Sequence, residues 1–352
     1  MKIGSVELSS PLVVAPMAGM TDTAFRRLVK RNGGCGLVVT EMVSSEGLVR
    51  GIDRTLEYAE YTEEERPVSI QVFGGDPDKM AEAARIVEGM GADIVDVNMG
   101  CPVRKIARHN AGCSLMREPG HAADVIRAMA RAVSIPVTVK MRAGWDDSSR
   151  NAPDLARRVQ DAGAAAVTIH GRTAEQSYTG LADWELVSRV AGDLEIPVFG
   201  SGDCVEPDQI TSRLQSGVSG VLVGRGVLRN PWILAQADAL SRGAAGPVVT
   251  LERRGQFLRD YLQLLLDERV TEQDGFRHVA PGVDAAPAER AVGRERWVIN
   301  KLRALCAWYS KGIEGGSDFR VRINSAASIR QVYDLIDTYF GCTVGVSTSG
   351  DR

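Results

Sequence analysis

A cysteine stands where an apolar run ends, in the stretch VDVNMGCPVRK from Val95 to Lys105. Cys101 follows a glycine and precedes a proline, and proline ends a strand because it has no N–H to donate. A nucleophilic cysteine needs an adjacent base, and the sequence shows no coupling of Cys101 to a histidine. A thiol with a pKa near 8.5 holds its proton at neutral pH, so we favour a general acid. The alternative role is that of a small buried hydrophobe.

Polar side chains also lie at the ends of other apolar runs. Lys140 is embedded in VTVKMRAGW, Gln71 in SIQVF, and His170 and Arg172 both lie in TIHGRT. A lysine in such a run is costly to bury, so it faces a polar site. We expect these groups to converge on one pocket, where Lys140 is a fixed cation for an anionic cofactor or intermediate. A structural ion pair is the alternative for Lys140.

Two glycine-rich turns have the composition of phosphate sites. VLVGRG contains Gly224, Arg225 and Gly226, and FGSGD contains Ser201, Gly202 and Asp203. Bare backbone N–H groups and a guanidinium bind phosphate well, and in α/β barrels the loops after strands seven and eight commonly do so.

The elements that must position these residues alternate between strands and helices. Eight short apolar runs, each followed by a helical pattern, predict the strands. They are Leu12–Pro16, Leu37–Glu41, Val68–Phe73, Ile94–Asn98, Val137–Met141, Ala166–His170, Pro197–Gly200 and Gly220–Gly224. This order favours an α/β fold, a (β/α)8 TIM barrel whose strand ends form one active face, over a doubly wound open sheet.

The pattern changes after residue 240. Three amphipathic segments predict an all-α helical domain: LERRGQFLRDYLQLLLDERV, ERWVINKLRALCAWYSKG and NSAASIRQVYDLIDTYF. We therefore expect a barrel domain over residues 1–240, a helical domain over 245–345, and a long mobile loop over about 271–295, which is rich in Pro, Gly and Ala.

Charge is distributed unevenly along the chain. The 352 residues carry a net charge of −3, but residues 290–330 hold nine basic side chains against three acidic ones. Tryptophans and a tyrosine interleave with this excess, which suits a polyanion, whereas a solvated helix face is the alternative. No run approaches the length of a membrane span, no signal peptide is apparent, and the scattered cysteines make no metal motif. We expect a cytoplasmic monomer without a metal.

Several motifs resemble those of the tRNA-dihydrouridine synthases, most of all the bacterial B-type branch. They follow the order of that family over nearly the whole chain, and NMGCP followed by a lysine is highly specific. The motifs are APMAGMTD, SIQVFG, DVNMGCPVRK, AGCSLM, VTVKMRAGW, TIHGRT, GVLVGRG with PWI, and AWY with FRVRIN.

The resemblance implies an FMN-binding barrel with a helical tRNA-binding domain. NADPH reduces the flavin, which passes hydride from N5 to uracil C6, while Cys101 gives a proton to C5. By motif position, Gln71 binds the flavin ring and Lys140 lies at its polar edge. The other implied flavin contacts are Pro16, Met17 and Ala18 at the ring, and His170, Ser201, Gly202, Asp203, Gly224 and Arg225 at the phosphate. From their location we expect Asn98, Arg142 and Arg172 at the uracil, and Arg320 and Arg322 at the tRNA backbone.

Two features depart from the family's pattern. Ser201 stands where the family usually has Asn, and the loop over 271–295 is longer. Two other readings stay open: a flavin oxidoreductase of free pyrimidines, such as a dihydroorotate dehydrogenase, and a non-redox RNA-binding protein. The first leaves the basic segment unexplained, and the second leaves Cys101 and Lys140 unexplained.

Overall fold

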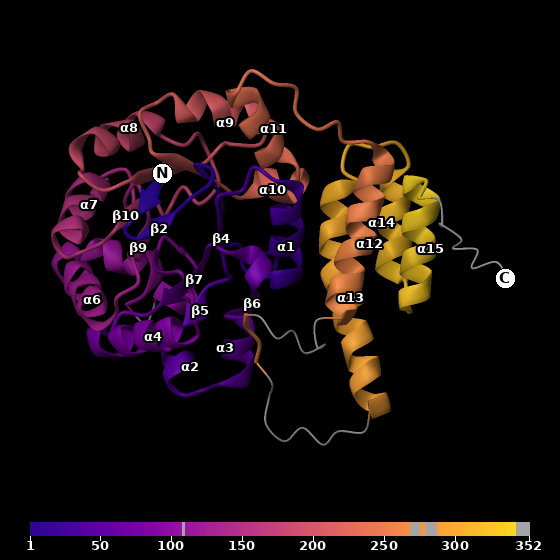
Figure 1. Ribbon diagram of the computed structural model, residues 1–352, viewed down its shortest axis with the longest axis horizontal. Helices are drawn as coiled ribbons and strands as arrows, with labels where there is room; N and C mark the ends of the chain where they lie inside the picture. Colours follow the sequence, from indigo (N-terminus) through magenta and orange to yellow (C-terminus); the bar gives the residue numbers. More distant parts are fainter. Residues whose placement is uncertain (108–109, 268–274, 279–286, 343–352) are drawn as a thin grey trace. The chain divides into compact units, whose positions relative to one another are not determined.

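A ring of eight parallel strands forms the centre of the larger part of the chain (Figure 1). The computed structural model describes residues 1–107, 110–267, 275–278 and 287–342. In chain order the strands are β3 (Leu12–Val14), β4 (Leu37–Val39), β7 (Val68–Phe73), β8 (Ile94–Met99), β9 (Val137–Arg142), β10 (Ala166–His170), β11 (Val198–Ser201) and β12 (Gly220–Val223). Because β12 pairs with β3 and β4 with β7, the ring is closed. The predicted TIM barrel is confirmed, and the open sheet is wrong.

Helices cover the outside of this ring (Figure 1). Those that follow barrel strands are α1 (Thr23–Asn32), α2 (Ser45–Val49), α3 (Asp53–Tyr58), α4 (Pro77–Gly89), α5 (Arg104–Ala107), α6 (Pro119–Ala132), α7 (Ala152–Asp161), α8 (Trp184–Asp193), α9 (Pro207–Leu214), α10 (Arg225–Arg229) and α11 (Ile233–Ser241). Their starts follow local chemistry: the Asp76 carboxylate caps α4 by accepting from the N–H groups of Asp78 and Lys79, and Pro77 occupies the first turn. The longer helices then bury an apolar face, as α4 does with Met80, Ala84 and Val87, whereas α3 has no buried residue.

Short strands close the amino end of the barrel and extend its side. A hairpin of β1 (Lys2–Ile3) and β2 (Val6–Glu7) contributes Ile3 to the cluster that fills the barrel, where it joins the inward-facing side chains of Val13, Ile94 and Phe199. β5 (Val43–Ser44) adds a parallel pairing to β7. Because apolar side chains fill the amino end of the barrel, we expect a binding site at its carboxyl end.

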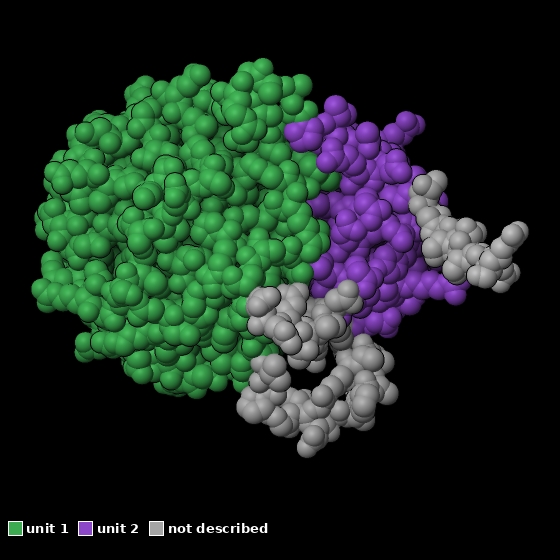
Figure 2. Space-filling view, in the orientation of Figure 1, with its two compact units in different colours: residues 1–246, 271–280 green, residues 247–270, 281–352 purple. Residues whose placement is uncertain are grey.

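The chain divides into two compact units (Figure 2). One contains residues 1–246 with 271–280, and the other contains residues 247–270 with 281–352. The second unit is helical, with α12 (Leu251–Asp267), α13 (Pro287–Tyr309), α14 (Gly316–Ser325) and α15 (Ile329–Phe340). The expectation of three helices is therefore wrong, since α14 was missed. Its ten residues carry only two buried large side chains, Phe319 and Ile323, so the helical period is weak in the sequence.

The predicted loop over residues 271–295 is shorter than expected. β13 (Gly275–Phe276) pairs with β6 (Tyr61–Thr62), and α13 already begins at Pro287. Proline is suited to the first turn of a helix, and the following Ala, Glu and Arg residues are good helix formers, which explains the earlier start. Residues 271–274 and 279–286 of this range lie outside the described residues.

Among the described residues, no helix is both long and apolar enough to cross a bilayer.

Candidate active site

The residues predicted to act in chemistry lie at the carboxyl side of the barrel strands. β7 and β8 carry Gln71 and Asn98, β9 carries Lys140 and Arg142, and His170 ends β10. The remaining predicted residues follow strands directly: Pro16, Met17 and Ala18 after β3, Cys101 after β8, Arg172 after β10, Ser201, Gly202 and Asp203 at the end of β11, and Gly224 and Arg225 after β12. Sequence spacing thus located one face correctly, because all parallel barrel strands end there.

Cys101 lies in an apolar environment, and the residue is 9% exposed. Ile106 and Ala111 share its buried cluster, with Met42 and Phe73 packed against it. Burial raises the pKa of Cys101, although Arg142 and Lys140 act in the opposite direction. The thiol therefore holds its proton at neutral pH, which suits a proton donor better than a nucleophile.

Two amides hold the segment that carries Cys101. Asn98 Oδ1 accepts hydrogen bonds from the backbone N–H of Cys101 at 2.9 Å and of Gly100 at 3.1 Å. Asn98 Nδ2 in turn donates to Gln71 Oε1 at 2.7 Å. Gln71 and Asn98 thus contact one another across neighbouring strands, and Asn98 fixes the backbone beside the thiol.

The Lys140 ammonium is a cation inside the barrel end. Its backbone is level with Asn98 on β8 and Thr168 on β10. Burial lowers the pKa of Lys140 to about 8, with the Arg142 charge acting in the same direction and the Asp96 and Cys101 charges opposing it. Within the described ranges its Nζ donates no hydrogen bond to another residue, so the group is available to an anion.

Four cations surround His170. Burial and the charges of Lys140, Arg142, Arg172 and Arg225 together lower the pKa of His170 to about 2, so the imidazole stays neutral. Arg172 Nη1 lies 3.4 Å from His170 Nε2, and a guanidinium can only donate. Nε2 is therefore the acceptor and the ring proton belongs to Nδ1.

The N–H groups of the Arg172 side chain mostly donate to other groups of the protein. It donates to Thr179 O at 3.0 Å, to Gly180 O at 2.6 Å and to Asp203 Oδ1 at 2.6 Å. The other Asp203 oxygen accepts from the backbone N–H of Ala182 at 2.7 Å. Arg172 and Asp203 therefore hold the loop after β10 rather than presenting free charges, a coupling that spacing did not reveal.

A tyrosine that the sequence reasoning missed lies among the cations of this face. Tyr178 is 61% exposed, and the guanidinium carbons of Arg225 and Arg142 lie 5.0 Å and 5.9 Å from its ring centroid. Arg142 also donates to Gly100 O at 2.8 Å and to Thr173 O at 2.9 Å, which ties β9 to both neighbouring loops. The only sequence signal for Tyr178 was its place in a strand-end loop.

The turn after β3 lies close to the turn after β12. A Cβ placed on Gly224 would lie 3.5 Å from Met17 Sδ and 3.6 Å from Ala15 Cβ, which is van der Waals distance, so the two turns are neighbours there. The Met17 backbone N–H donates to Thr21 Oγ1 at 3.0 Å, and Gly19 N–H donates to the buried Glu41 carboxylate. These contacts shape a wall of the site, in which Ala18 is exposed.

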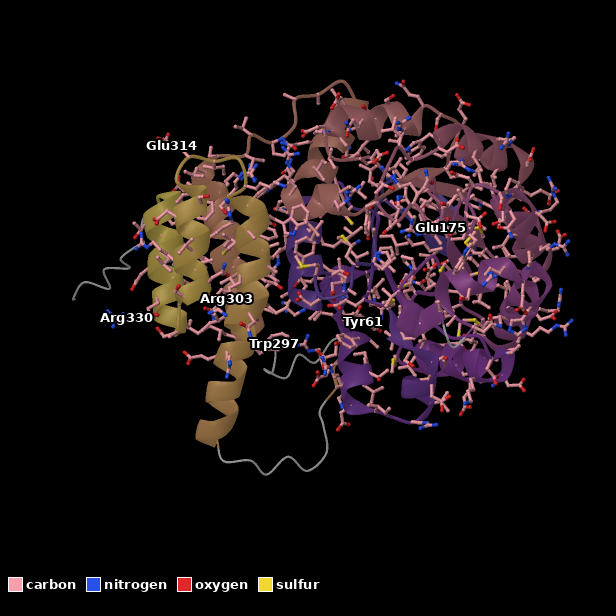
Figure 3. The ribbon with its side chains drawn as sticks, turned by 180° about the vertical axis from the view of Figure 1, so that it is seen from behind. Tyr61, Glu175, Trp297, Arg303, Glu314 and Arg330 are labelled. Atoms are coloured by element: carbon pink, nitrogen blue, oxygen red, sulfur yellow. The ribbon has the colours of Figure 1, made fainter. Side chains whose placement is uncertain are left out.

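In the helical unit, the predicted tRNA contacts point to different faces. Arg320 donates to Ser310 O at 3.3 Å and is partly buried, whereas Arg322 is 56% exposed and lies 4.0 Å from Asp318. Arg303 donates to Ile323 O and Ala326 O at the end of α14. Figure 3 shows Arg303 and Arg330 toward one end of the helical unit and Glu314 toward the other.

Metal chemistry has no evident ligand set, since the described ranges contain no group of three or more His, Cys, Asp or Glu able to hold an ion.

Comparisons with known proteins identify the relatives of this chain. The family model described as Dihydrouridine synthase (Dus) matches residues 13–338. A probable tRNA-dihydrouridine synthase of Rickettsia bellii is 38% identical over 342 residues, or 96% of this chain and 97% of that protein. The tRNA-dihydrouridine synthase B of Xanthomonas campestris pv. campestris is 36% identical over 346 residues, or 98% of this chain and 97% of that protein. A probable tRNA-dihydrouridine synthase of Rhodobacter capsulatus is 45% identical over 248 residues, or 70% of this chain and 76% of that protein.

Proposed function

Because this chain belongs to the dihydrouridine synthase family, we propose that it reduces the C5=C6 bond of specific uridines in tRNA to 5,6-dihydrouridine, with FMN as cofactor and NADPH as reductant. The observation that carries the proposal is a proton-holding thiol, Cys101, on the same barrel face as the ammonium of Lys140. Adding a hydride at C6 and a proton at C5 balances the reaction.

The residues of the barrel face fit an anionic flavin. An ammonium lodged in the barrel, with no recorded partner among the described residues, suits negative charge at a ring, and Lys140 is such a group. Gln71 would donate to the ring, with Pro16, Met17 and Ala18 along its edge. The phosphate end would meet the neutral His170, the turn from Ser201 to Asp203, and Gly224 with Arg225. When bound, FMN would accept a hydride from NADPH and pass it on to the uracil.

Proton transfer is the task of Cys101. Its raised pKa keeps the thiol protonated, and the Asn98 amide fixes the backbone that carries it. Arg142 has three recorded hydrogen bonds from Nε and Nη1, which leaves Nη2 for a uracil carbonyl. Asn98 and Arg142 therefore orient the uracil while Cys101 delivers its proton to C5.

A target uridine must leave its stack to reach this depth, at a cost of about a few kcal/mol. The exposed ring of Tyr178 offers a surface on which a base can stack, worth about 1–3 kcal/mol. Basic side chains of the helical unit, Arg322 among them, would bind phosphates of the tRNA. Arg172 and Asp203 would support the loop that carries Tyr178.

Incubation of the purified protein with unmodified tRNA and NADPH, followed by mass spectrometry of the nucleosides, tests the proposal. We expect a yellow protein with a flavin spectrum and NADPH-dependent dihydrouridine. Turnover of a free pyrimidine in place of tRNA would favour a dihydroorotate dehydrogenase-like activity. A colourless protein that cannot be reconstituted with FMN, yet binds tRNA, would favour the non-redox reading.

A further inference from the structure

A buried carboxylate underlies the amide pair that holds the Cys101 segment. Asp96 is 6% exposed in the middle of β8, level with Gln71 on β7 and Thr138 on β9. Its Oδ2 accepts from Gln71 Nε2 at 2.7 Å, and its Oδ1 accepts from Thr138 Oγ1 at 2.6 Å. A continuous chain of hydrogen bonds thus runs from Asp96 through Gln71 and Asn98 to the backbone N–H of Cys101.

The direction of this chain is determined at both ends. The carboxylate of Asp96 accepts, so the amide atom of Gln71 that faces it must be Nε2. The backbone N–H groups of Gly100 and Cys101 can only donate, so the Asn98 atom that faces them must be Oδ1. Between the two amides, Asn98 Nδ2 then meets Gln71 Oε1, the one arrangement in which every donor has an acceptor.

Building on the proposed function, we propose that Asp96 is a positioning residue that sets the direction of this hydrogen-bond chain. It thereby decides which atoms Gln71 and Asn98 present to the rings bound in the site. Each amide keeps one N–H that the chain does not use. For Asn98 Nδ2, the further contact recorded is the Met42 sulfur at 3.8 Å, which is a weak acceptor.

The site therefore offers N–H donors and selects ring atoms that accept. A uracil carbonyl satisfies the Asn98 N–H, whereas an exocyclic amino group at the same place, as in cytosine, sets two donors against each other and leaves both unsatisfied. Asp96 contributes to the choice of base without contacting it. Burial raises the pKa of Asp96, whereas the hydrogen bonds from Gln71 and Thr138 and the positive charge of Lys140 favour its ionised form.

The substitution Asn98→Asp tests the chain from its far end. The new carboxylate at position 98 sets an acceptor against Gln71 Oε1, and turning the Gln71 amide over only moves the conflict to Asp96. Adding Asp96→Asn supplies a donor to the turned amide and restores complementarity. The matched control repeats these changes in a Gln71→Met background, where like-charge repulsion between positions 96 and 98 remains but no amide connects them.

The measurement is the unfolding midpoint of the flavin-free protein with and without Asn98→Asp, in the wild-type and Asp96→Asn backgrounds, each with Gln71 and with Gln71→Met. With Gln71 in place, we expect Asn98→Asp to lower the midpoint by about 5 °C in the wild-type background and by less than half of that in the Asp96→Asn background. With Gln71→Met, we expect the difference between these two costs to fall to less than half of its value with Gln71. A difference that is as large with Gln71→Met as with Gln71 would overturn the proposal.

These midpoints are independent of the reaction. Position 96 and position 98 both contact Gln71, so a coupling that is lost in the Gln71→Met background reports the amide between them. If the wild-type protein made no dihydrouridine while the coupling was observed, the proposed function would be wrong and the role of Asp96 would stand. If dihydrouridine formed but the coupling was absent, only the role of Asp96 would be wrong.

Discussion

Burial shifts the pKa values of Cys101 and Lys140 in opposite directions, and in both cases it favours the neutral form. A buried thiolate is poorly solvated, so the pKa of Cys101 rises, whereas a buried ammonium is poorly solvated, so the pKa of Lys140 falls. The thiol is therefore a stable proton store. The ammonium is held near its point of ionisation, where a bound anion restores its charge.

The thiol of Cys101 should be needed for product but not for flavin reduction. We expect Cys101→Ala to lower the rate of dihydrouridine formation by about 10²–10⁴-fold, the usual contribution of a positioned acid, with NADPH oxidation retained. Stopped-flow measurement of flavin reduction and nucleoside mass spectrometry separate the two steps.

Cys113 provides the matched control for that substitution. It is buried beside Cys101, its N–H donates to Cys101 O at 3.1 Å, and burial raises its pKa to about 11. Cys113→Ala should keep product formation within a few fold of wild type, apart from a loss of stability. Equal losses of dihydrouridine formation in both variants would contradict the proton-donor role of Cys101.

The ammonium of Lys140 should destabilise the flavin-free fold and stabilise the flavin complex. Its pKa falls from 10.5 to about 8 on folding, and each unit is worth about 1.4 kcal/mol. Below pH 8 the ammonium is charged in both states and its cost is complete. Between pH 8 and 10.5 the unfolded chain binds more protons, so stability rises with pH.

Lys140→Met should therefore raise the free energy of unfolding of the flavin-free protein at pH 7, by roughly 2–3 kcal/mol, and weaken FMN binding. Denaturant unfolding and fluorescence titration with FMN measure the two effects. In the wild type, FMN affinity should fall as pH rises through about 8. A variant that is less stable at pH 7, or a flat pH dependence of affinity, would contradict this account.

At the scale of elements, α14 places its two arginines in different environments. Residues two apart on a helix do not share a face. Phe319 packs on Tyr339 with ring centroids 4.4 Å apart, and this contact anchors the helix so that Arg320 turns toward Ser310 while Arg322 turns to solvent. We expected both arginines to contact tRNA, but Arg320 contacts the protein itself and only Arg322 lies at the surface.

Arg322→Ala should weaken tRNA binding and make the slope of log affinity against log salt shallower by about 1, as for one lost phosphate contact. Filter binding over a salt series measures this. The matched control is Arg158→Ala, since Arg158 is 52% exposed on α7 and pairs with Asp154 four residues earlier, as Arg322 does with Asp318. The same change of slope in both variants would show that Arg322 lies on an ordinary solvated helix face and makes no specific phosphate contact.

At the scale of the whole molecule, a net charge of −3 must be reconciled with a polyanionic substrate. Attraction then depends on local basic surface rather than on total charge, and it is screened by salt. We expect kcat/KM for tRNA to fall by roughly 10²-fold or more between about 50 and 200 mM salt. NADPH oxidation without tRNA should change far less, and parallel steady-state assays compare the two. A parallel decline of both rates would argue against a phosphate-binding surface.

The barrel was predictable from the sequence because the alternation of apolar runs and helical segments is local. The location of Cys101, Lys140 and His170 on one face was predictable because parallel strands must all end there. Four features were not predictable: the direction of the hydrogen-bond chain from Asp96, the pairing of Arg172 with Asp203, the position of Tyr178 and the helix α14. These depend on strand register and on packing between distant segments, which only the tertiary structure decides.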